Sequence, residues 1–299
     1  KWLDILCNKS TIAHLTSEKL GALPLPLPPL DEQELIANFL DRKTKQIDDL
    51  IAKKEAILAK LDEKRSAIIS HAVTKGLDPT VPMKDSGIEW LGSIPEHWNS
   101  IKTRYCSEFI TSGSRGWAVY YADQGSLFIR ITNLFRKSIY LNLEDSKFVK
   151  LSLKASEGIR TQLKQDDVLI SITADIGIIG YVASNIPEPA YINQHIALIR
   201  FNTPKVNSKF VSYFLASEKP QKLFRASTDT GAKAGMSLLT VQRIQFALPP
   251  LSEQRSIATA LSDMDELLGG LDRLITKKRD LKQSAMQQLL TGKKRLTGF

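Results

Sequence analysis

The sequence predicts an α+β protein, in which a globular domain with a curved sheet is flanked by two long helices that form a coiled-coil spacer. The motif Pro-Pro-Leu-x-Glu-Gln occurs twice, at residues 28–33 and 249–254, and each copy opens a long run of apolar residues with helical spacing. The residues between the two copies instead contain short apolar runs that are typical of strands.

The first copy of the motif predicts one helix over residues 31–74. Asp31 is a suitable N-cap with Glu34 three residues later, as in a capping box, and Gly76 is a suitable C-terminal cap. Such a helix would be roughly 65 Å long and needs a partner helix to cover its apolar stripe. The stripe consists of Ile36, Leu40, Ile47, Leu50, Ile57, Leu61 and Ile68.

The second copy predicts a second long helix that starts with Ser252 as its cap and reaches residues 291–292. Gly269 and Gly270 should weaken it locally, by roughly 1 kcal/mol each against alanine. Its stripe consists of Ile257, Leu261, Met264, Leu268, Leu271 and Ile275. We expect helix or partner packing at Ile47, Leu50, Ile57, Leu61, Ile68, Leu261, Met264, Leu268, Leu271 and Ile275.

The middle of the chain predicts a mixed domain. Strands are expected over 127–131, 167–172, 176–182 and 196–201, and short helices over 207–217 and 220–226. The sheet is expected to be strongly curved or to form a small barrel. The predicted segments are residues 1–27, a helix at 28–78, the globular domain at 79–248 and the distal helix at 249–299.

Composition favours a polyanionic partner and a cytoplasmic location. The net charge is +9, and residues 80–248 hold 20 Lys or Arg against 14 Asp or Glu. Cys7 and Cys106 form no disulfide or zinc pattern, which indicates a reducing compartment. No apolar run approaches the ~20 residues that span a bilayer, and no signal peptide is visible.

Catalytic motifs are not found, so we expect a protein that is not an enzyme and that uses no cofactor or metal. The sequence has no phosphate-binding loop, no HExxH and no GxSxG. Asp166, Asp167 and Asp175 could suggest a nuclease cluster, but strand-end turns are the favoured interpretation. The histidines at 14, 71, 97 and 195 lack metal-ligand spacing, and structural roles are expected for them.

Three loops combine short polar side chains, glycine and a cation, which suits phosphate anchoring and base-edge readout. They lie at 111–117, 130–137 and 228–235. The alternative for each is an ordinary polar loop. The candidate DNA-binding residues are Ser112, Ser114, Arg115, Trp117, Arg130, Thr132, Asn133, Arg136, Lys137 and Lys233.

The motif combination resembles the specificity subunits of type I restriction–modification systems. The doubled Pro-Pro-Leu-x-Glu-Gln helix carries the resemblance, together with residues 69–77, 87–98, 167–171, 193–196 and 287–295. It implies a target recognition domain at 79–248, two antiparallel conserved helices and, at 1–27, a remnant of a first recognition domain. Whether the protein is naturally half-sized or part of a longer chain is left open.

The resemblance also implies the function. The domain would read one half of a bipartite target in double-stranded DNA, and the helices would dock methyltransferase subunits, which endonuclease–translocase subunits then join. A homodimer, or pairing with another half-subunit, would complete the site. Two other classes are weighed: a coiled-coil scaffold without sequence-specific DNA binding, and an enzyme such as a nuclease or methyltransferase.

Overall fold

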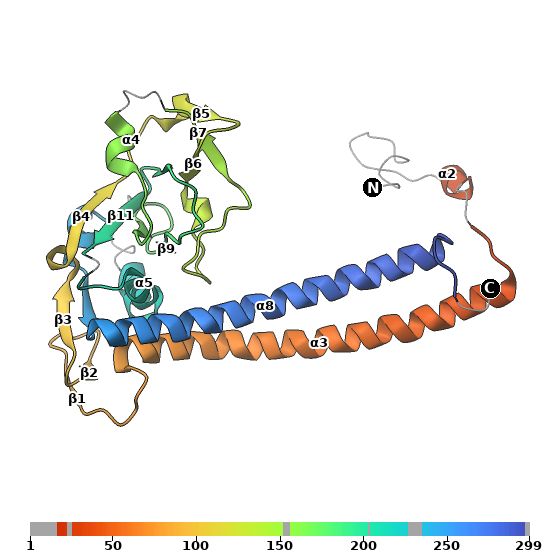
Figure 1. Cartoon of the computed structure of the whole chain (residues 1–299), viewed down its shortest axis with the longest axis horizontal. Coiled ribbons are helices and arrows are strands. Elements are labelled where there is room, and N and C mark those ends of the chain that lie inside the picture. Colours follow the sequence, from red (N-terminus) through yellow and green to blue (C-terminus); the bar gives the residue numbers. More distant parts are fainter. Residues whose placement is uncertain (1–16, 23–25, 152–155, 203, 227–234, 297–299) are drawn as a thin grey trace. The chain divides into compact units, whose positions relative to one another are not determined.

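The computed structural model describes residues 17–22, 26–151, 156–202, 204–226 and 235–296. It forms two compact units, one made of residues 1–59 with 270–299 and the other of residues 60–269. The helices are α2 (Ser17–Gly21), α3 (Leu30–Lys75), α4 (Ser156–Thr161), α5 (Ser208–Ala216), α6 (Glu218–Ala226), α7 (Leu238–Arg243) and α8 (Leu251–Leu290). Figure 1 labels α2, α3, α4, α5 and α8. The predicted remnant at 1–27 lies mostly outside the described residues.

Both long helices are confirmed, and each begins one residue earlier than its expected cap. α3 begins at Leu30 and α8 at Leu251, so Asp31 and Ser252 lie inside the first turn and not at the N-cap. The first backbone acceptors are instead the proline carbonyls, because Gln33 N donates to Pro29 O and Gln254 N to Pro250 O. The expected end of α3 is confirmed, since Lys75 is its last residue and Gly76 follows with φ +81°.

The glutamine of each motif copy makes the same local bond. Gln33 Nε2 donates to Pro28 O at 2.7 Å, and Gln254 Nε2 donates to Pro249 O at 2.8 Å. Both bonds reach back five residues, over the turn at which the chain enters the helix. The repeat in the sequence is therefore a repeat in structure.

In the unit of residues 1–59 and 270–299, segments of α3 and α8 run side by side in opposite directions (Figure 1). Ion pairs join Glu55 to Arg279 and Asp48 to Lys282. Ile36, Leu40 and Leu289 form a small apolar cluster in the same unit. The predicted antiparallel pairing of the two helices is thus observed in this unit, through these ion pairs and the apolar cluster.

Burial along the helices differs from the expected stripe at three positions. Leu50, Ile57 and Ile68 are exposed by 38%, 52% and 46%. The buried apolar positions of α3 are Ile36, Leu40, Ile51, Ile69, Ala72 and Val73. Among the α8 predictions Leu261, Leu268 and Ile275 are buried, and Met264 and Leu271 are half-buried. The prediction of helix packing within this chain is therefore wrong for Leu50, Ile57 and Ile68, whose apolar side chains are exposed.

The unit of residues 60–269 holds the predicted mixed domain. Its strands are β1 (Met83–Asp85), β2 (Ser93–Pro95), β3 (Asn99–Lys102), β4 (Ser107–Ser112), β5 (Tyr121–Ala122), β6 (Ser126–Ile129), β7 (Lys147–Val149), β8 (Val168–Ser171), β9 (Ile179–Tyr181), β10 (Ala190–Ile192), β11 (Ile196–Phe201) and β12 (Gln245–Leu248). They form sheets of order β4-β11-β8-β9 and β10-β6-β7-β5 and the ribbons β1-β2 and β12-β3. None of these sheets closes into a barrel within the described residues. Of the two expected forms, the open sheet is therefore the one observed.

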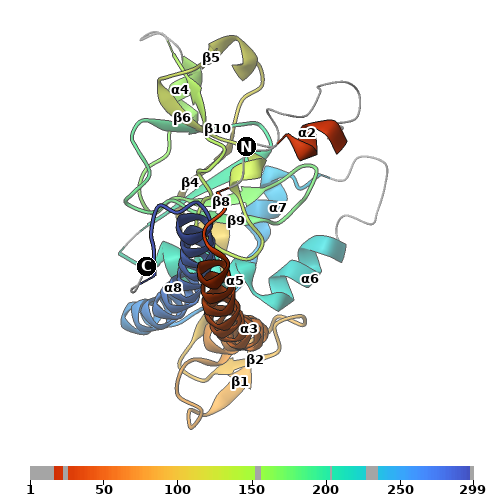
Figure 2. The same cartoon turned by 90° about the vertical axis from the view of Figure 1, so that its right-hand side faces the viewer.

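The sheet β4-β11-β8-β9 is buried on both faces. Val168 and Ile170 face a core that includes Phe210 and Phe214 of α5, while Leu169 faces a second core shared with β6 and β10. This alternation follows from the two-residue period of a strand. Figure 2 turns the view and labels α6 and α7, which belong to the same unit.

The ends of the long helices inside this unit are anchored by polar bonds. Asp265 of α8 accepts two hydrogen bonds from Arg65 of α3, at 2.6 and 3.1 Å, and one from Tyr213 of α5 at 2.8 Å. Glu253 accepts from Trp98 Nε1 at 3.0 Å. Three helices therefore share one carboxylate.

Among the described helices, none has an apolar stretch of the length needed to cross a membrane.

Candidate nucleic-acid interface

The candidate surface begins where β4 ends against the turn between β10 and β11. A side chain at Gly113 would place its Cβ 2.0 Å from Asn193 O, so the two backbones touch directly. Ser114 then forms a bridge with Asn193, and Gly113 N donates to Ile196 O at 3.2 Å. Ser112 and Ser114, predicted from one loop, are thereby placed beside the turn 193–195.

A second loop joins this surface from β8. Thr173 Oγ1 hydrogen-bonds His195 Nδ1, and Thr173 forms a bridge with Gly235. Gln194 Nε2 lies 2.9 Å from His195 Nε2, and His195 N donates to Asn193 Oδ1 at 3.2 Å. Hydroxyl, amide and imidazole groups thus converge at one edge of the sheet, and groups of these types read base edges.

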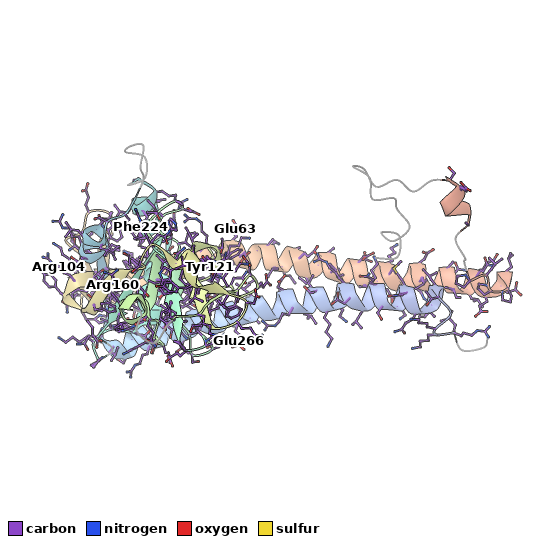
Figure 3. The ribbon with its side chains drawn as sticks, turned by 90° about the horizontal axis from the view of Figure 1, so that it is seen from above. Glu63, Arg104, Tyr121, Arg160, Phe224 and Glu266 are labelled. Atoms are coloured by element: carbon purple, nitrogen blue, oxygen red, sulfur yellow. The ribbon has the colours of Figure 1, made fainter. Side chains whose placement is uncertain are left out.

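Cations border the converging groups. Arg115 is exposed, and Arg160 of α4 donates to Ser114 Oγ at 3.2 Å. Figure 3 labels Arg160 in the unit of residues 60–269. The interface therefore combines positive charge for phosphates with short polar side chains for bases.

Trp117 has a different role from the predicted one. It is only 3% exposed, and its ring packs at centroid distances of 4.8 Å from Phe128 and 5.5 Å from Tyr191. Its Nε1 has no hydrogen-bond partner among the described residues. The prediction of a DNA contact is wrong for this ring, because the aromatic cluster covers its faces.

Asn133 is also buried and organises a loop. Its Oδ1 accepts from Arg130 N at 2.9 Å, and its Nδ2 donates to Asn142 O at 2.8 Å. Arg130 in turn donates to the Asp145 carboxylate at 2.8 Å, which lowers the pKa of that carboxyl below its usual value. Asn133 is therefore a structural residue, and Arg130 is held by an ion pair.

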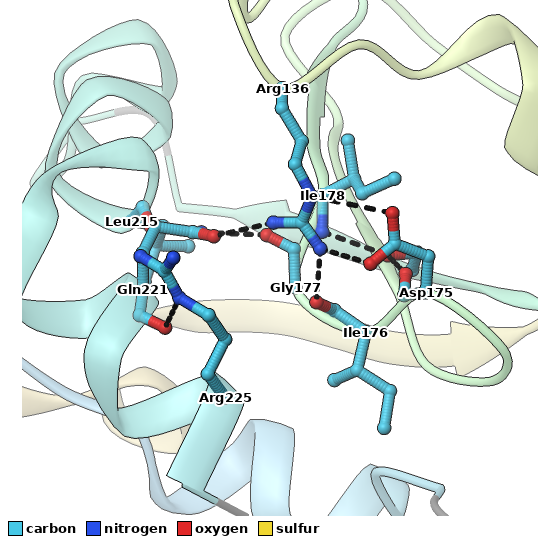
Figure 4. A network of polar contacts seen from close by, with 9 residues as sticks. Arg136, Asp175, Ile176, Gly177, Ile178, Leu215, Gln221 and Arg225 are labelled. Carbon is cyan, nitrogen blue, oxygen red and sulfur yellow. Dashed lines mark hydrogen bonds and ion pairs between the residues drawn. The ribbon is translucent and has the colours of Figure 1, made fainter. Parts of the chain in front are cut away.

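The remaining predicted residues fall into three groups. Thr132 and Lys137 are exposed, and the described residues provide no ion pair for Lys137. Arg136 donates to Asp175 and to Gln221, so its guanidinium is bonded to two protein groups although 40% of the side chain is exposed (Figure 4). Lys233 and most of the loop 228–235 lie outside the described residues.

Arg160, Thr173 and Gln194 were not among the predicted contacts. Thr173 carries no sequence signal, because only the pairing of β11 with both β4 and β8 brings its loop to this edge. Arg160 carries none either, because it lies in α4 and is distant in sequence from Ser114. Gln194 does carry one, since it lies in the segment 193–196 that resembles known recognition domains. The described residues contain no group of three or more His, Cys, Asp or Glu side chains placed to hold a metal ion.

The fold and this edge define an α+β domain whose chain continues into a long helix at each end. The model of the family "Type I restriction modification DNA specificity domain" matches residues 1–60 and 128–277. The chain therefore belongs to this family, and the resemblance drawn from its motifs is confirmed.

Curated relatives and solved structures agree with this assignment. The chain is 26% identical over 292 residues to the type I restriction enzyme MjaVIII specificity subunit of Methanocaldococcus jannaschii, covering 95% of this chain and 65% of the relative. It is 26% identical over 300 residues to the EcoBI specificity subunit of Escherichia coli, covering 94% and 60%. The chain thus spans less than two thirds of these relatives' length.

Two crystal structures share the fold. The HsdS subunit from Thermoanaerobacter tengcongensis matches with a TM-score of 0.55 at 16% identity, covering 97% of this chain and 65% of that chain. The type I restriction–modification S subunit from M. genitalium matches with a TM-score of 0.55 at 14% identity, covering 96% and 68%. The predicted α+β architecture with long helices is confirmed.

Proposed function

We propose that this chain is a non-catalytic DNA-recognition subunit of a type I restriction–modification complex, working in the cytoplasm. Its domain of residues 79–248 reads one half of a bipartite double-stranded target. The observation that carries this proposal is the convergence of Ser114, Thr173 and Gln194 on one edge that also carries the cations Arg115 and Arg160, in a chain of the specificity-domain family. Substrate and partners follow from the family and from the surfaces described here.

The reading mechanism follows from the chemistry of the edge. Arg115 and Arg160 attract the phosphate backbone irrespective of sequence, and this attraction falls steeply with salt. Gln194 offers an amide that can pair with adenine in the major groove, and Ser114 and Thr173 offer hydroxyls that donate and accept. The rigid contact of Gly113 with Asn193 fixes the spacing of these groups.

Competition binding tests the proposal. A random duplex library selected with the full chain gives the preferred sequence, and the preferred and scrambled duplexes are then compared at one fixed salt concentration. We expect the preferred duplex to bind at least ~10³-fold more tightly, as specific DNA-binding proteins do. Equal affinities with methyltransferase subunits present would refute the proposal.

The outward apolar side chains of the helix pair fit the docking of methyltransferase subunits. In the unit of residues 1–59 and 270–299, Leu50, Ile57, Leu274 and Leu281 are exposed by 38–52%. In both helices they lie about 90° from the buried stripe, in the same rotational sense. Two antiparallel helices that meet along their buried stripes therefore present both sets on one side, which we name the helix ridge.

Introducing a charge on the helix ridge tests this assignment. Leu274→Glu should abolish co-purification with methyltransferase subunits, whereas Leu290→Glu, on the same helix and exposed by 55%, should not. Light scattering of the chain alone tests whether a second copy of the chain, and not a methyltransferase subunit, occupies the helix ridge. Self-association at micromolar concentration that Leu274→Glu removes would assign the ridge to a homodimer or to another half-subunit.

The same ridge is the one observation that favours a coiled-coil scaffold without DNA specificity. A scaffold would retain partner assembly and its biological activity after deletion of residues 80–248. A specificity subunit would lose target methylation, which sequencing of methylated bases in the host detects.

A further inference from the structure

The loop that brings Thr173 to the candidate interface is held on its other side by Arg136, together with Gln221. This loop joins β8 to β9 and includes two residues in the left-handed region, Ala174 with φ +63° and Gly177 with φ +84°. Its inner turn is closed by Ser171, whose Oγ accepts from Ile178 N at 2.8 Å and whose carbonyl accepts from Gly177 N at 2.9 Å. A non-glycine residue at positive φ is strained and needs support from its surroundings.

Arg136 provides that support with every edge of its guanidinium. Nε donates to Asp175 Oδ2 at 3.3 Å, and Nη2 donates to Asp175 Oδ1 and to Ile176 O, the latter at 3.1 Å. Nη1 donates to Gln221 Oε1 at 3.0 Å. The planar fork of arginine suits such a multiple attachment, whereas a lysine ammonium does not.

Gln221 connects this arginine to the helical layer. Its Nε2 donates to Gly177 O at 2.7 Å and to Leu215 O at 2.9 Å, so it joins the loop to the end of α5 (Figure 4). A cavity of about 280 Å³, lined in part by Arg136, Gly177 and Gln221, lies beside the loop. The polar bonds therefore hold the loop where it borders the cavity, in addition to the apolar packing of Ile176 in the core.

The front of the loop contacts the residues that face the proposed DNA site. Thr173 hydrogen-bonds the His195 ring, and Ile172 N donates to His195 O at 2.9 Å. Met236 N donates to Ile172 O at 2.7 Å. A movement of the loop would therefore displace Thr173, the imidazole and the Gln194 amide beside it.

We propose that Arg136 is a positioning residue for sequence readout, which fixes the loop 172–178 from behind and does not itself contact DNA. The inference rests on the proposed function and corrects the prediction that Arg136 binds DNA. Four of its five N–H groups are already bonded to Asp175, Ile176 and Gln221, and its charge is balanced by Asp175. The neighbouring Lys137 is exposed and is the matched candidate for a phosphate contact.

Four variants of the full chain test the inference by duplex binding at several salt concentrations. Arg136→Gln removes the fork, Arg136→Lys keeps the charge without the fork, and Asp175→Asn removes the balancing carboxylate. We expect all three to lower the preference for the selected duplex over a scrambled one by about 10-fold or more, the value of one base readout, with an unchanged salt slope. Lys137→Gln should instead weaken both duplexes alike and reduce the slope by about one.

A second measurement follows the loop itself. In the nuclear magnetic resonance spectrum of the full chain, Arg136→Gln should shift the His195 ring signals and speed amide exchange of Gly177 and Ile178, while Lys137→Gln should change neither. Asp175→Asn keeps the test available if Arg136→Gln does not fold.

The outcomes separate the two proposals. A wild-type chain without sequence preference refutes the proposed function. A wild-type preference that survives Arg136→Gln overturns the positioning role alone. A salt slope that falls by about one in Arg136→Gln, with a wild-type slope in Arg136→Lys, overturns it too, because Arg136 would then contact phosphate.

Discussion

The glutamine of the repeated motif gives the sharpest quantitative prediction. The Gln254 side chain is fully buried and makes three bonds, to Pro249 O at 2.8 Å, to Lys205 O at 3.3 Å and from Asn207 N at 2.8 Å. Gln33 is half-buried. Among the described residues its side chain makes only the equivalent of the first bond, to Pro28 O at 2.7 Å. The two copies therefore offer a matched comparison.

Replacing each glutamine by leucine keeps the size of the side chain and removes the bonds. At about 1 kcal/mol for each net hydrogen bond, Gln254→Leu should lower the free energy of unfolding by about 3 kcal/mol and Gln33→Leu by about 1 kcal/mol. Unsatisfied buried backbone groups would add to the cost for Gln254.

Urea unfolding measures both variants. Tryptophan fluorescence follows mainly the unit of residues 60–269, which holds three of the four tryptophans (Trp90, Trp98 and Trp117), and far-ultraviolet circular dichroism follows the long helices. Equal losses for Gln254→Leu and Gln33→Leu would show that the buried bonds to Lys205 and Asn207 contribute nothing, and would refute the reasoning.

Three further predictions concern other sites. Burial raises the pKa of the Cys106 thiol to about 12, so in a Cys7→Ser background the native protein should resist iodoacetamide at about pH 8 and react only when unfolded. Its stabilising effect should be complete below its ordinary value of 9.0 and be lost as the pH rises towards 12, seen as alkaline loss of stability. Gly270→Ala should raise stability by about 0.5–1 kcal/mol, because a new Cβ meets only an arginine tip at 3.8 Å within a helix; a lower melting temperature would contradict this. The bond from Arg295 lowers the pKa of Glu32 below 4.5, so the stabilisation is complete above that value and is lost as the pH falls through the lowered value. In Arg295→Gln, helix stability measured by circular dichroism should fall less steeply as the pH is lowered. An unchanged dependence on pH would exclude this pair as the cause of the acid loss of stability.

The long helices could be predicted because their periodicity extends over many turns. The wrong positions have a physical cause, since seven-residue steps connect Leu50 to Ile57 in one stripe and Leu40 to Ile47 in another. The structure buries Leu40 and exposes the first pair. A sequence pattern alone does not decide which of two neighbouring apolar stripes meets the partner helix.

The candidate site could be predicted only in part, because strand pairing assembles it. Ser114 is 79 positions before Asn193 in the chain, yet the two are bridged through the placement of β11 beside β4. Trp117 was misjudged for the same reason, since Phe128 and Tyr191 cover it from distant strands. Local composition identified a polar, cationic loop without revealing which of its side chains turn inward.

The contact of Gly113 with Asn193 makes the backbone frame of the interface independent of the side chains proposed to read the DNA sequence. Because this contact involves only backbone, the shape of the sheet edge is independent of the side chains on either side of it. We therefore expect new target sequences to arise from substitutions at Ser112, Ser114 and Gln194 while the frame persists. A library varied at these three positions should remain folded with Gly113 kept, and should lose folded members when Gly113 is varied as well.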